Sequence, residues 1–145
     1  KKLFQLDNSK IMRTLQSKNS MIKDINEMQA ILIDMLKTHE SVFKIVLDTP
    51  DKFEVIGTKP AMQGKKKVEG MYFSTIIPKP KDVRLYFFPA YTHAAEIKAM
   101  MPEDVAKCLK GKSCFHIKKM DETLQNNFKL VIAKGIELYQ RDGLL

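Results

Sequence analysis

The spacing of apolar residues changes from a helical period to a strand period near residue 42. Between residues 20 and 40, apolar side chains recur every three or four positions, as on one face of an amphipathic helix. Asn19 and Ser20 precede this stretch, and their side-chain oxygens can cap the first amides of a helix. The pattern predicts one helix over residues 20–40, with an apolar stripe of Ile22, Ile25, Met28, Leu32, Met35 and Leu36.

Strict alternation follows in the segment VFKIVLD and again after the turn DTPD. Successive side chains of a strand point to opposite faces, so alternating apolar residues predict a half-buried hairpin. Pro50 fixes φ in the turn between the two strands, and Asp48 can accept hydrogen bonds from nearby amides. The residues expected on the buried face are Phe43, Ile45, Leu47, Phe53 and Val55.

Two further strands are predicted over residues 70–77 and 83–89, joined by the proline turn PKPKD. A lysine loop over residues 63–67 precedes them. In the strand over 83–89, Val83, Leu85 and Phe87 are expected to face the core. The side chains expected on the opposite face are those of Arg84, Tyr86 and Phe88.

The last third of the chain predicts helices around one more strand. Pro102 suits the first turn of a helix that carries Cys108 and ends before Gly111. In SCFHIKK, Phe115 and Ile117 fall on one face, and Cys114, His116 and Lys118 fall on the other. Asp121 is expected to cap the final helix, whose stripe is Leu124, Phe128, Val131, Gly135, Leu138 and Tyr139, and which ends at Gly143.

These elements predict an α+β fold with the order α-β-β-β-β-α-β-α. Strands that alternate apolar and polar side chains suit an antiparallel sheet of about five strands with helices packed on one face. The other face is then open to solvent. Residues 1–18 show weak periodicity and are expected to form an N-terminal arm or irregular helix, whereas residues 19–145 are expected to form a single domain.

Composition narrows the class of protein. The chain has 145 residues, of which 44% are hydrophobic, enough for one core without disulfides. No apolar run approaches the length of a membrane span, and KKLFQLDNSK lacks the apolar core of a secretory signal. The two cysteines lack CxxC spacing and the three histidines are scattered. We therefore expect a cytoplasmic protein with no cofactor and no transition-metal site.

The net charge of +8 is concentrated in two segments. Residues 59–84 hold seven basic side chains against Glu69 and Asp82, and residues 107–119 hold five lysines and no acid. Clustered positive charge attracts anions, although a lysine-rich turn often only keeps a domain soluble. The basic loop of interest consists of Lys65, Lys66 and Lys67.

The outward side chains of the last two strands form the candidate site. If these strands are neighbours, imidazole, guanidinium, ammonium and phenol groups share the open face, together with Tyr72 or Ser74 of the preceding strand. Such a surface can hold an anionic small molecule or an acidic protein segment, and the alternative is a plain solvated face. The candidate residues are Arg84, Tyr86, Cys114, His116, Lys118 and Lys112.

No catalytic residue is predicted. Cys114 and His116 lie two apart on a strand, about 6.5 to 7 Å between Cα atoms, which is loose for a nucleophile and its base. Binding of single-stranded nucleic acid is a further alternative, since Tyr72, Tyr86 and Phe88 can stack bases if they share the open face. Phosphate contacts would come from Lys65, Lys66, Lys67, Lys79, Lys81, Lys110 and Lys112.

Four segments resemble the YdhG-like domain-of-unknown-function family, over roughly residues 40–145. They are FKIVLDTPDKFEV, MYFSTIIPKPKDVRLYFFPAY, LKGKSCFHIKKMDETL and ELYQRDGLL. The resemblance implies a compact frataxin-like α/β sandwich, and it raises iron delivery as a function because the family includes a frataxin-like iron chaperone. Iron needs grouped carboxylates, and here Lys23 and Lys37 interrupt the acidic residues Asp24, Glu27, Asp34 and Glu40.

Overall fold

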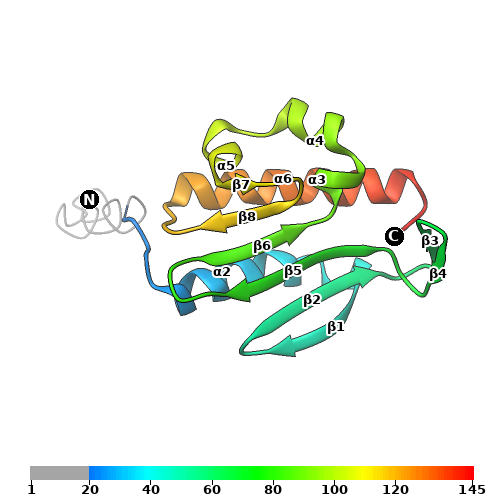
Figure 1. Cartoon of the computed structure of the whole chain (residues 1–145), viewed down its shortest axis with the longest axis horizontal. Coiled ribbons are helices and arrows are strands. Elements are labelled where there is room, and N and C mark those ends of the chain that lie inside the picture. The colour runs from blue at the N-terminus through cyan, green and yellow to red at the C-terminus, as the bar shows by residue number, and fades with distance from the viewer. Residues whose placement is uncertain (1–19) are drawn as a thin grey trace, which may run out of the picture.

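The computed structural model describes residues 20–145, which form an open antiparallel sheet with helices on one face (Figure 1). The prediction for residues 1–18 lies outside the described residues. Within residues 20–145 the main sheet has six strands in the spatial order β1-β2-β5-β6-β8-β7. They are β1 (Phe43–Thr49), β2 (Lys52–Gly57), β5 (Tyr72–Pro78), β6 (Val83–Phe87), β7 (Leu109–Lys110) and β8 (Cys114–Ile117).

The predicted fold class is confirmed, with two additions. The short strand β7 extends the sheet beyond the five strands expected. The predicted lysine loop instead forms a small separate hairpin of β3 (Ala61–Gln63) and β4 (Lys66–Val68), with a turn at Gly64. Lys66 and Lys67 therefore lie on a strand, and Lys65 lies in the turn.

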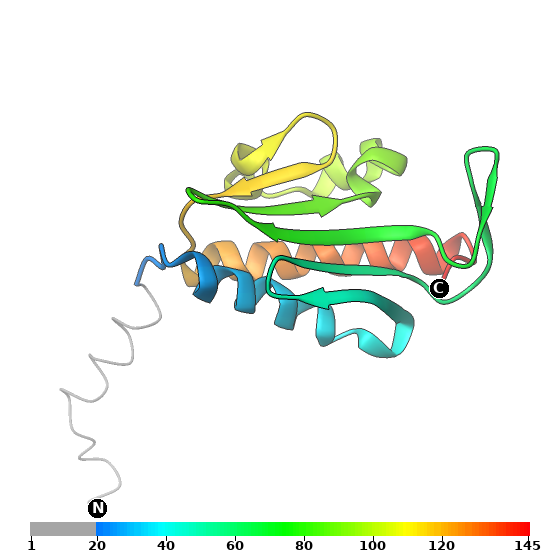
Figure 2. The same ribbon diagram turned by 60° about the horizontal axis from the view of Figure 1, so that its bottom comes forward.

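Two long helices, α2 (Ile25–Lys37) and α6 (Glu122–Arg141), lie behind the sheet in the view of Figure 1, and Figure 2 shows them side by side. Three short helices pack beside α6: α3 (Pro89–Thr92), α4 (Ala94–Met100) and α5 (Glu103–Cys108). A 3-10 turn, η2 (Glu40–Val42), leads into β1. The sheet face away from α2 and α6 carries no helix of the described chain, as expected.

The helix predicted from residue 20 begins later. Ile22 pairs with Met120 through two backbone hydrogen bonds of 2.8 Å, which hold this segment extended. Asp24 then caps α2, because its carboxylate accepts a 2.8 Å hydrogen bond from the Glu27 amide. The capping role predicted for Ser20 is therefore wrong, whereas the buried stripe of Met28, Leu32, Met35 and Leu36 is confirmed.

A β-bulge changes the faces predicted for β1. Ile45 lies opposite Val55, Leu47 lies opposite Glu54, and the extra residue Val46 falls between them. One inserted residue reverses the alternation, so Leu47 joins the outer face instead of the core. β1 is also an edge strand, and only Phe43 of this strand is buried. The prediction of three core residues in this strand is therefore wrong for Ile45 and Leu47.

A second irregularity lies in β5, opposite Val55 and Ile56 of β2. Phe73 and Ser74 are adjacent, yet both are fully buried. The Ser74 hydroxyl donates a 2.7 Å hydrogen bond to the Tyr86 carbonyl, which satisfies this buried group. Ser74 is therefore absent from the open face where it was a candidate.

The core lies between the sheet and α6, and it is rich in aromatic rings. Phe73 contacts the rings of Phe43, Phe87 and Tyr139 at centroid distances of 4.6, 5.3 and 5.2 Å. Aromatic pairs at these spacings add to the free energy gained from burial. The predicted core residues Val83, Leu85, Phe87, Phe115 and Ile117 are all buried, as is the predicted stripe of α6.

A polar cluster fastens the end of α6 to α4. The ring of His93 bridges Thr92 and Asp142, with the Nε2 to Oδ2 distance at 2.6 Å. Arg141 donates two hydrogen bonds to Glu96 and one to Asp142. His93 and then Arg141 hold the pKa of the Asp142 carboxyl below its ordinary value of 3.8.

We expect this cluster to contribute stability that disappears in acid. Because the pKa of Asp142 is lower in the folded chain, its contribution is complete above the unfolded value of about 3.9 and is lost as pH falls through the folded pKa. Asp142→Asn should therefore be less stable than wild type at pH 6, and the difference should shrink below about pH 4. Urea midpoints measured across this range test the expectation.

The matched control is Asp51→Asn, because Asp51 is an exposed turn residue with no ion pair among the described side chains. This substitution should leave the midpoint nearly unchanged at both ends of the range. A difference between wild type and Asp142→Asn that stays constant down to pH 2 would contradict the assigned role of Asp142.

Candidate functional site

The structure brings the predicted outward residues of β6 and β8 together. Arg84 lies directly opposite His116, and Tyr86 lies directly opposite Cys114. Residues opposite one another on antiparallel strands share a face, so all four side chains lie on the open side of the sheet. The expectation that these two strands are neighbours is confirmed.

A buried carboxylate organises this group. Asp82 precedes β6 and its side chain is only 8% exposed. The Arg84 Nε donates to Asp82 Oδ1 at 3.2 Å, and His116 Nδ1 lies 3.8 Å from Asp82 Oδ2. The hydrogen bond with Asp82 raises the pKa of the Arg84 guanidinium, so this cation stays charged. Asp82 thus holds the guanidinium in place and lies near the imidazole.

The middle of the open face is a polar network. The Thr75 hydroxyl donates to Glu54 Oε1 at 2.9 Å, and the Tyr72 hydroxyl is hydrogen-bonded to the same Thr75 oxygen. Burial raises the pKa of Tyr72 to about 12. Burial also raises the pKa of the Cys114 thiol, against smaller opposite effects of Tyr86 and Arg84. A protonated thiol is a poor nucleophile, so this face suits binding better than covalent chemistry.

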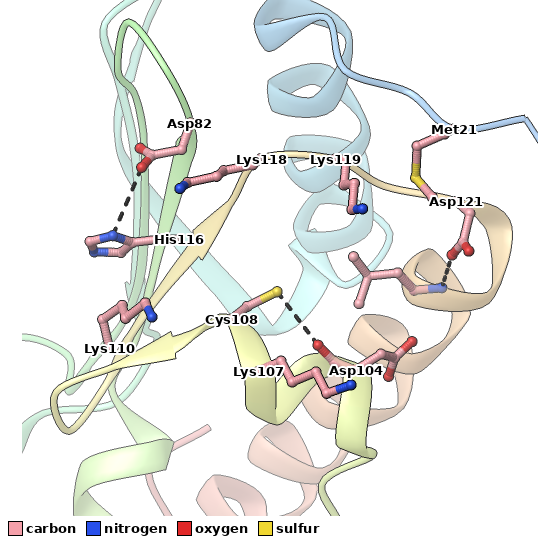
Figure 3. Close-up of a pocket in the computed structure, with 11 residues that line it drawn as sticks. Met21, Asp82, Asp104, Lys107, Cys108, Lys110, His116, Lys118, Lys119 and Asp121 are labelled. Atoms are coloured by element: carbon pink, nitrogen blue, oxygen red, sulfur yellow. Dashed lines mark hydrogen bonds and ion pairs between the residues drawn. The ribbon is translucent and has the colours of Figure 1, made fainter.

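A pocket of about 480 Å³ opens where β8 forms the edge of the sheet (Figure 3). β7 pairs only with Cys114 and Phe115, which leaves the second half of β8 without a strand on this side in the described chain. α5 and the segment that enters α6 close the space instead. The lining residues are Met21, Asp82, Asp104, Lys107, Cys108, Lys110, His116, Lys118, Lys119, Asp121 and Leu124.

The three carboxylates of the pocket are already occupied. Asp82 binds Arg84, and Asp121 caps α6 by accepting a 2.8 Å hydrogen bond from the Leu124 amide. Asp104 accepts hydrogen bonds from the Asn127 amide group at 2.9 and 3.1 Å. Each acid therefore has a hydrogen-bond partner within the protein, and Arg84 also balances the charge of Asp82.

The lysines of the pocket, in contrast to its carboxylates, have few partners within the protein. Lys107 forms only an exposed ion pair of 3.7 Å with Glu103. Among residues 20–145, Lys110, Lys118 and Lys119 form no ion pair or side-chain hydrogen bond. Figure 3 shows these lysines around the mouth of the pocket, with His116 on the sheet side and Cys108 on the helix side. The pocket therefore holds ammonium groups that are free to contact a ligand, and its four lysines outnumber its three carboxylates.

The remaining candidate residues are divided between this pocket and other parts of the surface. Lys118 belongs to the pocket, but Lys112 lies in the turn between β7 and β8, with its Nζ 5.5 Å from the centre of the Tyr91 ring. The basic group Lys65, Lys66 and Lys67 belongs to the β3–β4 hairpin and does not line the pocket. Of the candidate residues, only His116 and Lys118 line the pocket, whereas Arg84, Tyr86 and Cys114 lie on the open face beside it.

Several pocket residues were not among the candidate residues of the open face. Lys110 was named only as a phosphate contact for nucleic acid, and Lys119 belongs to the lysine cluster of residues 107–119, whereas the structure places both in one pocket with His116. Asp82 was counted only as one of two acids in the basic segment 59–84. The sequence did contain a signal for its role: Asp82 lies two residues before Arg84, and residues two apart on a strand fall on the same face.

Burial raises the pKa of Cys108 as well, and its Sγ contacts the Asp104 carbonyl at 3.5 Å.

Within the described chain, no three His, Cys, Asp or Glu side chains gather closely enough to hold a metal ion. None of the helices between residues 20 and 145 has both the length and the apolar character needed to cross a membrane.

Comparison of the chain with models of protein families, with curated proteins and with solved structures gives no match. The resemblance to the YdhG-like family therefore stays a prediction, and the function must be argued from the geometry of the site.

Proposed function

We propose that this protein is a non-catalytic binding module whose pocket at the free edge of β8 takes a small anionic molecule. The observation that carries the proposal is the contrast between three occupied carboxylates and the three unpaired ammonium groups of Lys110, Lys118 and Lys119 around one pocket. An anion gains charge-assisted hydrogen bonds from these groups without displacing an existing partner.

The shape and lining of the pocket indicate the class of ligand. A volume of about 480 Å³ is typical of sites for small molecules. Met21, Cys108 and Leu124 add apolar surface beside the lysines. The favoured ligand therefore carries a carboxylate or phosphate group on a compact, partly apolar body. An acidic protein segment shares the same charge, and the experiment below separates the two.

Anion binding is favoured over the alternatives for this pocket. Both cysteines have a pKa raised by burial, which weakens them as nucleophiles at neutral pH. Iron delivery would need grouped carboxylates, and Asp24 uses its carboxylate to cap α2. Membership of the YdhG-like family would be compatible with a binding role, and it remains part of the proposal.

We expect Lys118→Ala and Lys119→Ala each to weaken binding of citrate or a phosphate monoester by about five- to tenfold, the loss of one charge-assisted contact. The matched control is Lys98→Ala, because Lys98 is an exposed lysine on α4 outside the pocket. Isothermal titration of the three variants measures the effect.

The same titration with a glutamate-rich peptide identifies the source of the anion. If the peptide binds more tightly than any small anion, the ligand of the pocket is an acidic protein segment and not a small molecule. Equal affinities for all three variants would contradict the proposed pocket, and the lysines would then serve only to protect a free sheet edge from association.

A further inference from the structure

We infer that a second surface, at the end of the sheet where β5 begins and β6 ends, binds single-stranded nucleic acid. Three rings form a continuous row there, which we call the aromatic row: Tyr72, Phe88 and Tyr91. The ring centroids of Tyr72 and Phe88 are 5.3 Å apart, and those of Phe88 and Tyr91 are 5.6 Å apart. The outermost ring, that of Tyr91, is 51% exposed.

The row results from tertiary structure. Tyr72 opens β5, Phe88 follows the end of β6, and Tyr91 lies one turn later on α3. The Tyr72 hydroxyl is fixed by Thr75, and its carbonyl accepts a 2.6 Å hydrogen bond from the buried Tyr139 hydroxyl. The Tyr72 ring is therefore fixed before binding and loses little conformational entropy when a base stacks on the row.

The face of the exposed Tyr91 ring is covered by a side chain of the protein itself, Lys112. Its ammonium lies 5.5 Å from the centre of the Tyr91 ring, in a cation–π contact. At an exposed site such a contact is weaker than the stacking of a base on the same ring. A base can therefore displace Lys112, and the released ammonium can bind the adjoining phosphate.

The β3–β4 hairpin adds charge at the same end of the sheet. The Gln63 side chain accepts a 3.3 Å hydrogen bond from the Tyr72 amide, which ties the hairpin to the aromatic row. Figure 1 shows the hairpin, the start of β5 and α3 towards this end. Residues 59–68 contain no acid, and the next one, Glu69, is paired with Lys44 at 3.1 Å. The exposed lysines of the hairpin are Lys65, Lys66 and Lys67.

Stacking rings beside unpaired lysines match a particular chemistry. Single-stranded nucleic acid offers both a π-face on every base and a phosphate charge on every nucleotide. A duplex hides its base faces within the stack, and an acidic peptide offers charge without planar bases. This surface shares no residue with the anion pocket, so the inference stands independently of the proposed function.

The test measures binding of labelled oligouridine by fluorescence anisotropy. We expect Tyr91→Ala to weaken binding about tenfold or more, whereas Tyr91→Phe should keep most of the affinity because it keeps the ring. Tyr91 is half-exposed, so neither change should unfold the protein. Lys118→Ala in the anion pocket should leave oligouridine binding unchanged.

A charge reversal tests the hairpin. We expect the logarithm of the affinity to fall as the logarithm of the salt concentration rises. Replacing Lys65, Lys66 and Lys67 by Glu should make this negative slope shallower by about two units, as expected for the loss of three phosphate contacts. The matched control reverses three exposed lysines outside this surface: Lys23, Lys98 and Lys129. It changes the net charge equally and should alter the slope far less.

Any of the following results would overturn the inference: no binding of oligouridine at low salt, equal binding of duplex and single strand, or equal affinities for wild type and Tyr91→Ala. Competition by polyglutamate as effective as that by oligouridine would also overturn it, because the surface would then recognise acidic chains through charge alone.

Discussion

Replacing Phe115 by Ala is expected to lower the free energy of unfolding by about 3–5 kcal/mol. Phe115 lies on β8, is fully buried, and packs edge-on against Phe128 of α6 at a centroid distance of 5.4 Å. It also contacts Phe87 at 6.5 Å. Its removal leaves a cavity between the sheet and α6, which these large neighbours cannot fill by small movements. Urea unfolding followed by circular dichroism measures the loss.

The adjacent residue provides the control. His116→Ala should leave the melting temperature nearly unchanged, because the ring lies on the open face and its contact with Asp82 is long, at 3.8 Å. The two neighbouring substitutions therefore test the assignment of faces on β8. If His116→Ala destabilises the protein as much as Phe115→Ala, the imidazole is part of the core and the proposed open face is wrong.

Replacing Gly70 by Ala is expected to cost more than about 3 kcal/mol, at the upper end of the range for overpacking. A Cβ at residue 70 would lie 1.9 Å from the carbonyl oxygen of Gly57 and 2.8 Å from its carbonyl carbon. Both atoms belong to the backbone where β2 ends, and the Gly57 amide is itself hydrogen-bonded to the Met71 carbonyl at 2.8 Å. The clash can be relieved only if the two chain segments separate. Thermal unfolding of the variant tests this.

Gly64→Ala is the control for Gly70→Ala, because it replaces a glycine that makes no close contact with another backbone segment. Gly64 has a φ of +65° in the β3–β4 turn, and a Cβ there would meet nothing within 4 Å. Its replacement should therefore cost only the strain of a left-handed residue, about 1–2 kcal/mol. Gly70 is not among the glycines with positive φ, so a loss at Gly70 no larger than that at Gly64 would show that the contact with Gly57 is not what requires glycine there.

The two proposed surfaces use different parts of the basic charge. The lysines of the pocket come from the segment around β7 and β8, whereas those beside the aromatic row come mainly from the β3–β4 hairpin. Lys112 belongs to the first segment in sequence but to the second surface in space. Substitutions at Lys118 and Tyr91 therefore provide independent tests of the two binding roles.

The sequence by itself determined the class of fold and the faces of the regular elements. Alternation in VRLYF and CFHI correctly assigned Val83, Leu85, Phe115 and Ile117 to the core, and Asp121 was correctly assigned as the cap of the last helix. These predictions succeed because side-chain direction in a regular strand or helix depends only on position along that element.

Only the tertiary structure decided where regularity fails and which segments meet. The bulge at Val46 turns Leu47 outward, and the irregularity in β5 buries Ser74. A single inserted residue of this kind leaves no clear mark on the hydrophobic pattern, because it is set by pairing with the neighbouring strand.

The sites depend on the same long-range contacts. Asp82 meets His116 because β6 and β8 are neighbours, although α3, α4, α5 and β7 separate them in the chain. The pocket exists because β7 stops after two residues, which leaves the edge of β8 beside Lys118 and Lys119. Local sequence sets which side chains are available, whereas strand order and register set the distances between them.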